Sequence, residues 1–196
     1  MEIAYIKNII GIIAIVLTFV GYTPYFIDLW KGKTKPHIFS WFIWGIVTSI
    51  IFALQKSDGA GIGSYVTLAV ALISAVIFFI GLKKGNRNIK KIDVVFLVLA
   101  LIAIPLWLLA HQPVLSIILL SSIDMLGFAP TIRKSWENPY SETLSLYTIT
   151  TFRHGLSLFA LQNYSIVTVL FPATWVIANA MFATMLLIRR KQLVPK

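Results

Sequence analysis

The sequence contains no cysteine, so a disulfide framework and a thiolate metal site are both excluded. Charge is also scarce, because only 12% of the 196 residues are charged and only 7 of them are acidic. The chain has no glycine-rich phosphate loop, no pair of histidines at metal-binding spacing and no nucleophile elbow. We therefore expect no ATP hydrolysis, no enzyme activity and no cofactor.

Hydrophobic residues make up 58% of the chain, which is too apolar for an ordinary soluble domain. They occur in blocks of about twenty, the length that a helix needs to cross a bilayer. Because hydrocarbon offers no water to backbone amides, each block is predicted to be helical. The expected fold class is all-α integral membrane, with seven transmembrane helices at about 8–30, 38–55, 62–82, 92–110, 114–133, 143–161 and 165–188.

The lysines and arginines test this count, because they favour the cytoplasmic side of a membrane protein. One side of a seven-span chain carries Lys31, Lys33, Lys35, Lys83, Lys84, Arg87, Lys90, Lys91, Arg133, Lys134, Arg189, Arg190, Lys191 and Lys196. The other side carries only Lys7 and Lys56, while Arg153 lies inside a span. This division predicts an outside N-terminus and a cytoplasmic C-terminus, in the plasma (inner) membrane. Membrane orientation then explains the net charge of +10, so we expect contact with membrane lipids and none with nucleic acid.

A short passage occurs twice in the chain. Gly21-Tyr22-Thr23-Pro24 returns as Gly127-Phe128-Ala129-Pro130, and each copy is followed by a tryptophan six residues after the proline. Farther along, Phe52-Ala53-Leu54-Gln55 returns as Phe159-Ala160-Leu161-Gln162. Internal repeats of this kind are typical of transporters.

The repeats divide the chain into two three-helix bundles, residues 1–85 and 113–196, joined by a linker helix in residues 86–112. A three-helix unit reverses direction between its start and its end, and the single linker helix restores it. The two bundles are therefore predicted to be parallel repeats around a shared path, with a binding site near the middle of the membrane. Both bundles lie in one chain, so no oligomer is required.

This 3+1+3 layout resembles the SWEET and PQ-loop transporters, and the resemblance covers essentially the whole chain. The segments 33–40 and 141–145 look like that family's polar loop after the proline. Tyr25 and Thr131 stand where the family has glutamine. Pnu-type vitamin transporters share the layout. The resemblance implies a uniporter or proton-coupled transporter of a small polar solute, a sugar being one candidate, that works by alternating access between the two bundles.

Pro24 and Pro130 lie near the cytoplasmic ends of the first and fifth predicted helices. Proline inside a helix removes a hydrogen bond and produces a kink. The resemblance implies that the two prolines act as gate hinges, and the alternative is a static kink that only shapes packing.

Trp175 and Asn179 lie one turn apart on the last predicted helix. The indole offers a flat apolar surface and the amide both donates and accepts, which suits a sugar or a similar polar ring. The resemblance implies that this pair binds solute, and Ser74 stands where the family often has a second asparagine. Trp44 is a further candidate, whereas Trp41 is interpreted as an interface anchor. The alternative for Asn179 is a hydrogen bond to a neighbouring helix.

Asp124 and Arg153 are both predicted near mid-membrane, on consecutive helices. Each charge costs about 2.5–3.5 kcal/mol there, so neither is expected to face lipid, and an ion pair between them is allowed. Asp124 is a candidate carrier of a coupled proton, and Arg153 a candidate for holding an anionic group of the cargo. The alternative is a structural salt bridge. For His154 a helix–helix hydrogen bond is favoured over proton relay.

Two rival functions remain. One is a vitamin or nucleoside facilitator of the same fold, since an aromatic cargo stacks on tryptophan. The other is a non-transporting membrane receptor or scaffold, which binds without moving solute.

Gln55 and Gln162 are either helix-end polar groups or gate residues.

Overall fold

The computed structural model describes residues 2–32, 36, 38–84, 91–137, 139–140, 142 and 144–193. These residues form seven α-helices and one short 3-10 helix, with no strand among them. The elements are α1 (Glu2–Trp30), α2 (Ile38–Ser57), η1 (Gly61–Ser64), α3 (Tyr65–Lys84), α4 (Lys91–Leu108), α5 (Pro113–Glu137), α6 (Leu144–Phe159) and α7 (Ile166–Gln192). The prediction of an all-helical chain is confirmed.

The helices overlap their predicted ranges and differ from them at the ends. α1 begins at Glu2 instead of residue 8, and α5 and α7 continue to Glu137 and Gln192, beyond the predicted 133 and 188. The prediction followed the apolar runs, whereas helical hydrogen bonding continues through the polar residues beside them. The short η1 precedes α3 because Gly59 and Gly61 have φ values of 77° and 65°, which interrupt the regular helix.

Four helical segments of the described chain are long and apolar enough to cross a membrane, by length and composition. They are Glu2–Trp30, Ile38–Ser57, Gly61–Lys83 and Ile166–Gln192. Two shorter apolar helices, Val94–Leu108 and Pro113–Phe128, accompany them. The chain is thus an apolar helical protein of membrane type, and the count of seven spans stays a prediction.

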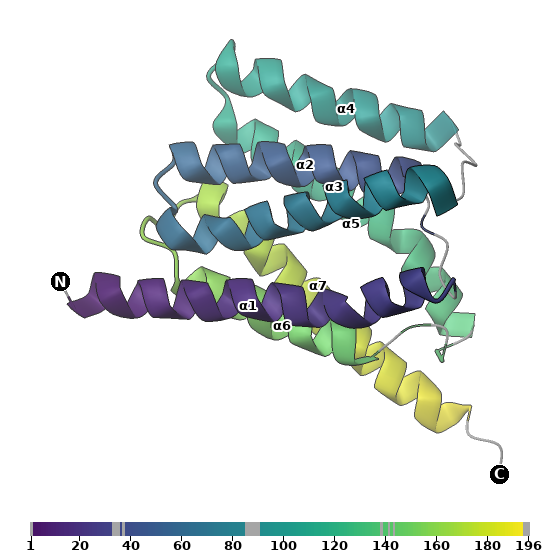
Figure 1. Ribbon diagram of the computed structural model, residues 1–196. Helices are drawn as coiled ribbons and strands as arrows, with labels where there is room; N and C mark the ends of the chain where they lie inside the picture. Colours follow the sequence, from purple (N-terminus) through teal and green to yellow (C-terminus); the bar gives the residue numbers. More distant parts are fainter. Residues whose placement is uncertain are drawn as a thin grey trace.

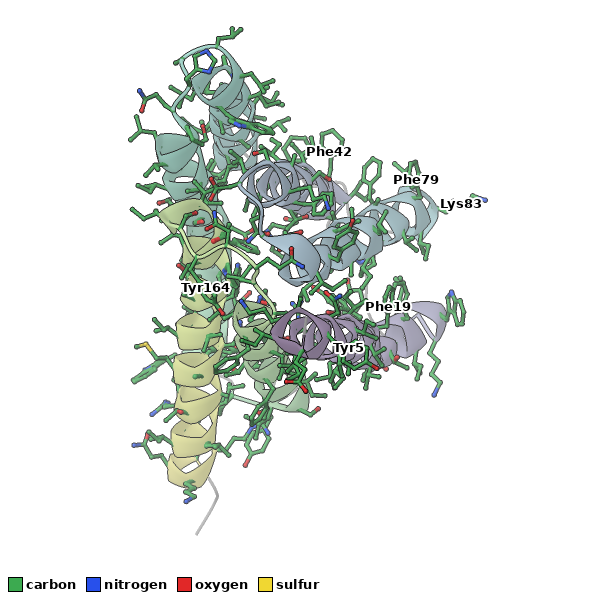
Figure 2. The ribbon with its side chains drawn as sticks, turned by 90° about the vertical axis from the view of Figure 1, so that its left-hand side faces the viewer. Tyr5, Phe19, Phe42, Phe79, Lys83 and Tyr164 are labelled. Atoms are coloured by element: carbon green, nitrogen blue, oxygen red, sulfur yellow. The ribbon has the colours of Figure 1, made fainter. Side chains whose placement is uncertain are left out.

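The outer faces of these helices carry large hydrophobic side chains. Tyr5, Phe19 and Phe79 are among the exposed aromatic residues, and Figure 2 shows their side chains on α1 and α3. Such a surface is unfavourable in water and favourable in hydrocarbon. At the end of α3, Lys83 extends away from the body of the molecule (Figure 2).

The helices pack as two similar triplets. α3 contacts both α1 and α2 and lies between them, and α7 likewise lies between α5 and α6. The triplets meet where α1 packs on α6 and where α2 packs on α5. α4 lies outside this ring, against α5 and α2 (Figure 1).

Corresponding helices of the triplets run in the same direction. α1 and α5 both begin on the left of Figure 1 and run to the right, as α3 and α7 do, whereas α2 and α6 run back. The N-terminus and C-terminus consequently lie at opposite ends of the bundle (Figure 1).

The two repeated glycines occupy matching contacts between the triplets. A Cβ added at Gly21 of α1 would lie 3.2 Å from Ile149 of α6, and one added at Gly127 of α5 would lie 3.4 Å from the indole nitrogen of Trp44 in α2. Small residues of this kind let membrane helices approach closely. Each glycine is therefore placed where its triplet packs on the other.

The division into bundles 1–85 and 113–196 with a linker in 86–112 stays a prediction, since residues 86–90 lie outside the described residues. α4, the helix of that linker, makes its contacts with α5 and α2.

The glycine that packs most tightly against backbone atoms of another segment predicts a stability effect. A Cβ at Gly63 of η1 would lie 2.7 Å from the carbonyl oxygen of Ser157 and 3.0 Å from the amide nitrogen of Leu161, both backbone atoms of the α6 end. We expect Gly63→Ala to lower the free energy of unfolding by about 1–3 kcal/mol, because backbone must move. Thermal unfolding in detergent measures this.

The control is Gly155→Ala, in the interior of α6. A Cβ there meets nothing within 4 Å, so the better helix propensity of alanine should leave stability unchanged or raise it by up to about 1 kcal/mol. Equal effects of the two substitutions would contradict the packing argument.

Candidate functional site

A cavity of about 380 Å³ lies between the two triplets. Its lining comes from α1, α2 and α3 of the first triplet and from α5, α6 and α7 of the second, and no described residue of α4 contributes. The lining also includes Pro36 and Glu142, which lie at the α1–α2 and α5–α6 connections. The cavity thus extends from the middle of the bundle to the end that holds these two connections.

The six residues predicted to bind solute all line this cavity. They are Asn179, Trp175, Asp124, Arg153, Trp44 and Ser74. Trp44 and Ser74 come from the first triplet and the other four from the second. Five helices bring these side chains together, although they are far apart in the sequence.

A chain of hydrogen bonds joins α5 to α7 within the cavity wall. The Trp175 indole nitrogen donates to Asp124 Oδ2 at 2.8 Å. Asn179 lies one turn farther along α7, and its amide donates to the Trp175 carbonyl oxygen at 2.8 Å. Asp124 and Asn179 are 5% and 2% exposed. The first bond orients the indole and joins α7 to α5, and the second orients the Asn179 amide against its own helix.

The ion pair allowed by the sequence does not form. Within the described residues Arg153 makes no salt bridge, its Nη1 atom is buried without a hydrogen-bond partner, and Asp124 accepts from Trp175 instead. The reason is topological, because α7 lies between α5 and α6 and separates the two charges. α6 packs on α1, which places the Arg153 guanidinium 6.0 Å from the centre of the Tyr22 ring, in a cation–π contact.

His154 lies beside Arg153 but contacts aromatic rings. Its ring stacks on Trp175 with 6.5 Å between centroids and an interplanar angle of 17°, and it meets the edge of Phe171 at 6.0 Å. The helix–helix hydrogen bond expected of His154 is not present among the described contacts. The imidazole instead forms part of a flat wall of the cavity.

Sequence reasoning missed most of the aromatic lining. Trp41 was interpreted as an interface anchor, but it is only 8% exposed and packs edge-on against Trp44 at 5.1 Å. The other missed aromatic residues of the lining are Tyr22, Tyr25, Phe128, Tyr147 and Phe171.

The repeat itself contained a usable signal for two of these aromatic residues. Tyr22 and Phe128 follow the two repeated glycines, and both line the cavity. The glycine that lets the triplets approach is therefore followed, in each triplet, by a ring that faces the space between them.

Pro24 takes no part in the described lining of the cavity. Pro24 lies inside α1 and is exposed. Pro130 falls within the range of α5, but its side chain lies outside the described residues. Their assignment as hinges stays a prediction.

Polar contacts close the opposite end of the bundle, where the α2–α3 and α6–α7 connections meet. Asp58 accepts from the Ser165 hydroxyl through Oδ2, and its carbonyl accepts from Asn163 Nδ2 at 2.7 Å. We call Asp58, Asn163 and Ser165 the end cluster. Nearby, the backbone N–H of Gln162 donates to the Ala60 carbonyl at 3.0 Å. The two triplets are thus bonded to each other at this end.

The two repeated glutamines differ in burial. Gln55 is 1% exposed, donates to the Thr168 carbonyl at 3.2 Å and accepts from the Thr67 hydroxyl at 2.9 Å. It therefore joins α2, α3 and α7 beneath the end cluster, whereas Gln162 is exposed. Burial and contacts assign Gln55 to the interior of the closed end.

Comparisons of the chain with protein-family models, with curated proteins and with solved structures find no match. The class that the fold defines is thus a helical protein with membrane-type apolar helices and an internal polar and aromatic cavity.

The hydrogen bond between Trp175 and Asp124 predicts a coupled stability effect. Trp175→Phe keeps a ring but removes the donor, which leaves a buried carboxyl without this partner. We expect it to lower the free energy of unfolding by about 1–3 kcal/mol. In an Asp124→Leu background the same substitution should cost much less, and a double-mutant cycle by denaturation in detergent measures the difference.

Trp136→Phe is the control, because Trp136 is 55% exposed at the end of α5. It should change stability little in either background. Equal losses for Trp175→Phe with and without Asp124 would show that the hydrogen bond contributes nothing.

Proposed function

We propose that this chain is a membrane transporter that moves a small polar solute by alternating access between the two helix triplets. The solute would bind in the cavity against Asn179, Trp175 and Asp124, with Arg153, Trp44 and Ser74 completing the site. Transport would be driven by the gradient of the solute itself or by a proton gradient.

The observation that carries the proposal is a polar and aromatic cavity inside helices whose outer faces are apolar. A bundle with no cargo has no need to hold an asparagine, a carboxyl and a guanidinium around an open space, since buried polar groups are costly. A volume of about 380 Å³ falls in the range of small-molecule sites.

The packing of the triplets supports a rocking motion. α3 and α7 tie their own triplets together, and the triplets meet chiefly through α1 with α6 and α2 with α5. A change in the angle between the triplets at the α1–α6 and α2–α5 interfaces would open one end of the cavity while it closes the other. The repeated glycines at both interfaces permit the close approach that such a motion needs.

The contrast between the two ends supports an inward-facing state. The end cluster bonds the triplets together at one end, and the cavity extends to the other. Lysine and arginine gather on the side to which the cavity extends, which is the cytoplasmic side under the positive-inside rule. The outside would then be the end of the N-terminus and of the end cluster.

The resemblance to SWEET and PQ-loop transporters supports the same reading through the 3+1+3 layout. The aromatic lining favours one variant of it, a vitamin or nucleoside facilitator, because planar rings stack on indole. Competition between sugars and nucleosides for uptake would separate these cargoes. A receptor or scaffold would instead bind its ligand with no flux across the membrane.

An uptake screen in proteoliposomes with sugars, vitamins, nucleosides and amino acids tests the proposal. For the solute that enters, we expect Asn179→Ala to lower uptake about tenfold or more, because a buried amide contact is lost. The matched control is Asn8→Ala, since Asn8 is exposed on α1, and it should transport normally.

Unchanged uptake in correctly folded Asn179→Ala would remove this residue from the site. The absence of any flux across the full panel, with the protein folded and inserted, would contradict the proposed function.

The end cluster predicts a shift between the two facing states. Asp58→Ala removes the acceptor of the Ser165 hydroxyl and should destabilise the state closed at this end. Losing about 1 kcal/mol would raise the population open there about fivefold. Since the chain has no cysteine, a Ser74→Cys reporter gives the only reactive thiol.

We expect a membrane-impermeant thiol reagent applied at the end-cluster side to label that reporter about fivefold faster in the Asp58→Ala background. Glu137→Ala, which removes an exposed carboxylate at the other end of the bundle, is the control and should not speed labelling. Equal labelling rates with and without Asp58 would contradict a closing role of the end cluster.

A further inference from the structure

The guanidinium of Arg153 lines the cavity without a carboxylate partner among the described residues. Arg153 is 4% exposed, lines the cavity and makes no salt bridge in the described part of the chain, and its Nη1 atom has no hydrogen-bond partner. A guanidinium carries five N–H donors and keeps its charge in proteins. A buried cation of this kind is strongly destabilising unless an anion accepts its hydrogen bonds.

The other titratable groups of the lining have partners of their own. Asp124 accepts from the Trp175 indole at 2.8 Å, and Glu142, at the α5–α6 connection, accepts from the Tyr147 hydroxyl at 2.8 Å. The imidazole of His154 stacks on Trp175. Among the described residues, the charge of Arg153 meets the face of the Tyr22 ring, 6.0 Å from its centre.

A second polar atom of the lining is also without a partner. The Ser74 hydroxyl is 1% exposed and its Oγ makes no hydrogen bond in the described chain. Most other hydroxyls of the bundle donate to a carbonyl one turn back in their own helix, as Thr48 does to Trp44 at 2.6 Å. Ser74 and Arg153 come from different triplets, so both can reach a ligand that lies between them.

The walls around these two atoms are flat rings. The stacked pair of Trp175 and His154 comes from the second triplet, and the edge-on pair of Trp41 and Trp44 from the first. Rings of this kind favour a planar apolar body over a saturated one. Guanidinium binds carboxylate through two parallel hydrogen bonds, a geometry that a spherical ion does not match.

We propose that the cavity binds a small planar anion, of which an aromatic carboxylate is the simplest case, through a bidentate pair with Arg153. This inference rests on the proposed function, because it names the chemical class of the transported solute. The anionic group would lie against Arg153 and within reach of Ser74, and the ring would lie between the aromatic walls of the two triplets.

Equilibrium binding to the purified full-length protein in detergent tests the inference without requiring transport. The probes are benzoate, the neutral analogue benzamide, and acetate, which has the anionic group but no ring. Calorimetry or quenching of tryptophan fluorescence measures binding. We expect benzoate to bind about tenfold or more tighter than benzamide, and tighter than acetate by a similar factor.

Substitutions identify the cation responsible. Arg153→Gln should weaken benzoate binding about tenfold or more and leave benzamide binding unchanged. The benzoate affinity of Arg153→Lys should lie between those of the unaltered protein and Arg153→Gln, because lysine keeps the charge but loses the bidentate geometry of the guanidinium. The matched control is Arg189→Gln, since Arg189 stacks on Trp136 at the end of α7, away from the cavity. It should bind benzoate as the unaltered protein does. Thermal unfolding of each variant checks that it is folded.

Equal affinity for benzoate and benzamide, benzoate binding that survives Arg153→Gln, or no binding of benzoate at all would overturn the inference. Acetate, chloride or phosphate binding as tightly as benzoate would also overturn it, because the site would then be one for simple anions. Arg153-dependent benzoate binding without flux in proteoliposomes would uphold the inference and remove the proposed function. Flux of a neutral solute that is insensitive to Arg153→Gln would uphold the proposed function and overturn the inference.

Discussion

A helix that faces hydrocarbon has no water to satisfy its polar side chains, and this constraint orders the whole molecule. On outward positions the hydroxyls bond to their own helix, as Ser49 does to the Gly45 carbonyl at 2.6 Å and Thr184 to the Ala180 carbonyl at 2.8 Å. Polar groups that need other partners are turned inward, where Asn179, Asp124 and Arg153 surround one cavity. The apolar exterior and the polar interior therefore have the same cause.

The same constraint makes the exceptions informative. Four buried side-chain atoms of the described chain have no hydrogen-bond partner, and two of them, Ser74 Oγ and Arg153 Nη1, belong to residues that line the cavity. A cation held in this state is costly, and nothing in the packing of α6 on α1 requires it. A bound anion would supply the missing acceptor and offset this cost, so the unpaired guanidinium supports an anionic cargo.

The two triplets share a scaffold but differ in chemistry. Gly21 and Gly127 lie at corresponding contacts between the triplets, and the residues after them, Tyr22 and Phe128, line the cavity. Asp124 and Arg153, two charged residues of the described cavity lining, both belong to the second triplet. In the first triplet Thr18 corresponds to Asp124, and it is buried with its hydroxyl bonded to the Ala14 carbonyl at 2.9 Å. The repeat thus accounts for the frame of the cavity, and under the proposed function the charges of the second triplet would determine which solute it accepts.

The sequence by itself determined the helices, the repeat and the polar residues that had to turn away from lipid, because apolar length, turn residues and side-chain polarity act locally along the chain. Asp124 was predicted to face the interior in this way, whereas Asn179 and Ser74 were predicted from the resemblance to SWEET transporters. Only the tertiary structure decided which polar groups are partners. Spacing along the chain allowed Asp124 to pair with Arg153, but α7 lies between α5 and α6, so the carboxyl bonds to Trp175 and the guanidinium lies against Tyr22. The order of helices around a bundle depends on packing between distant segments, and the pairing of buried charges depends on that order.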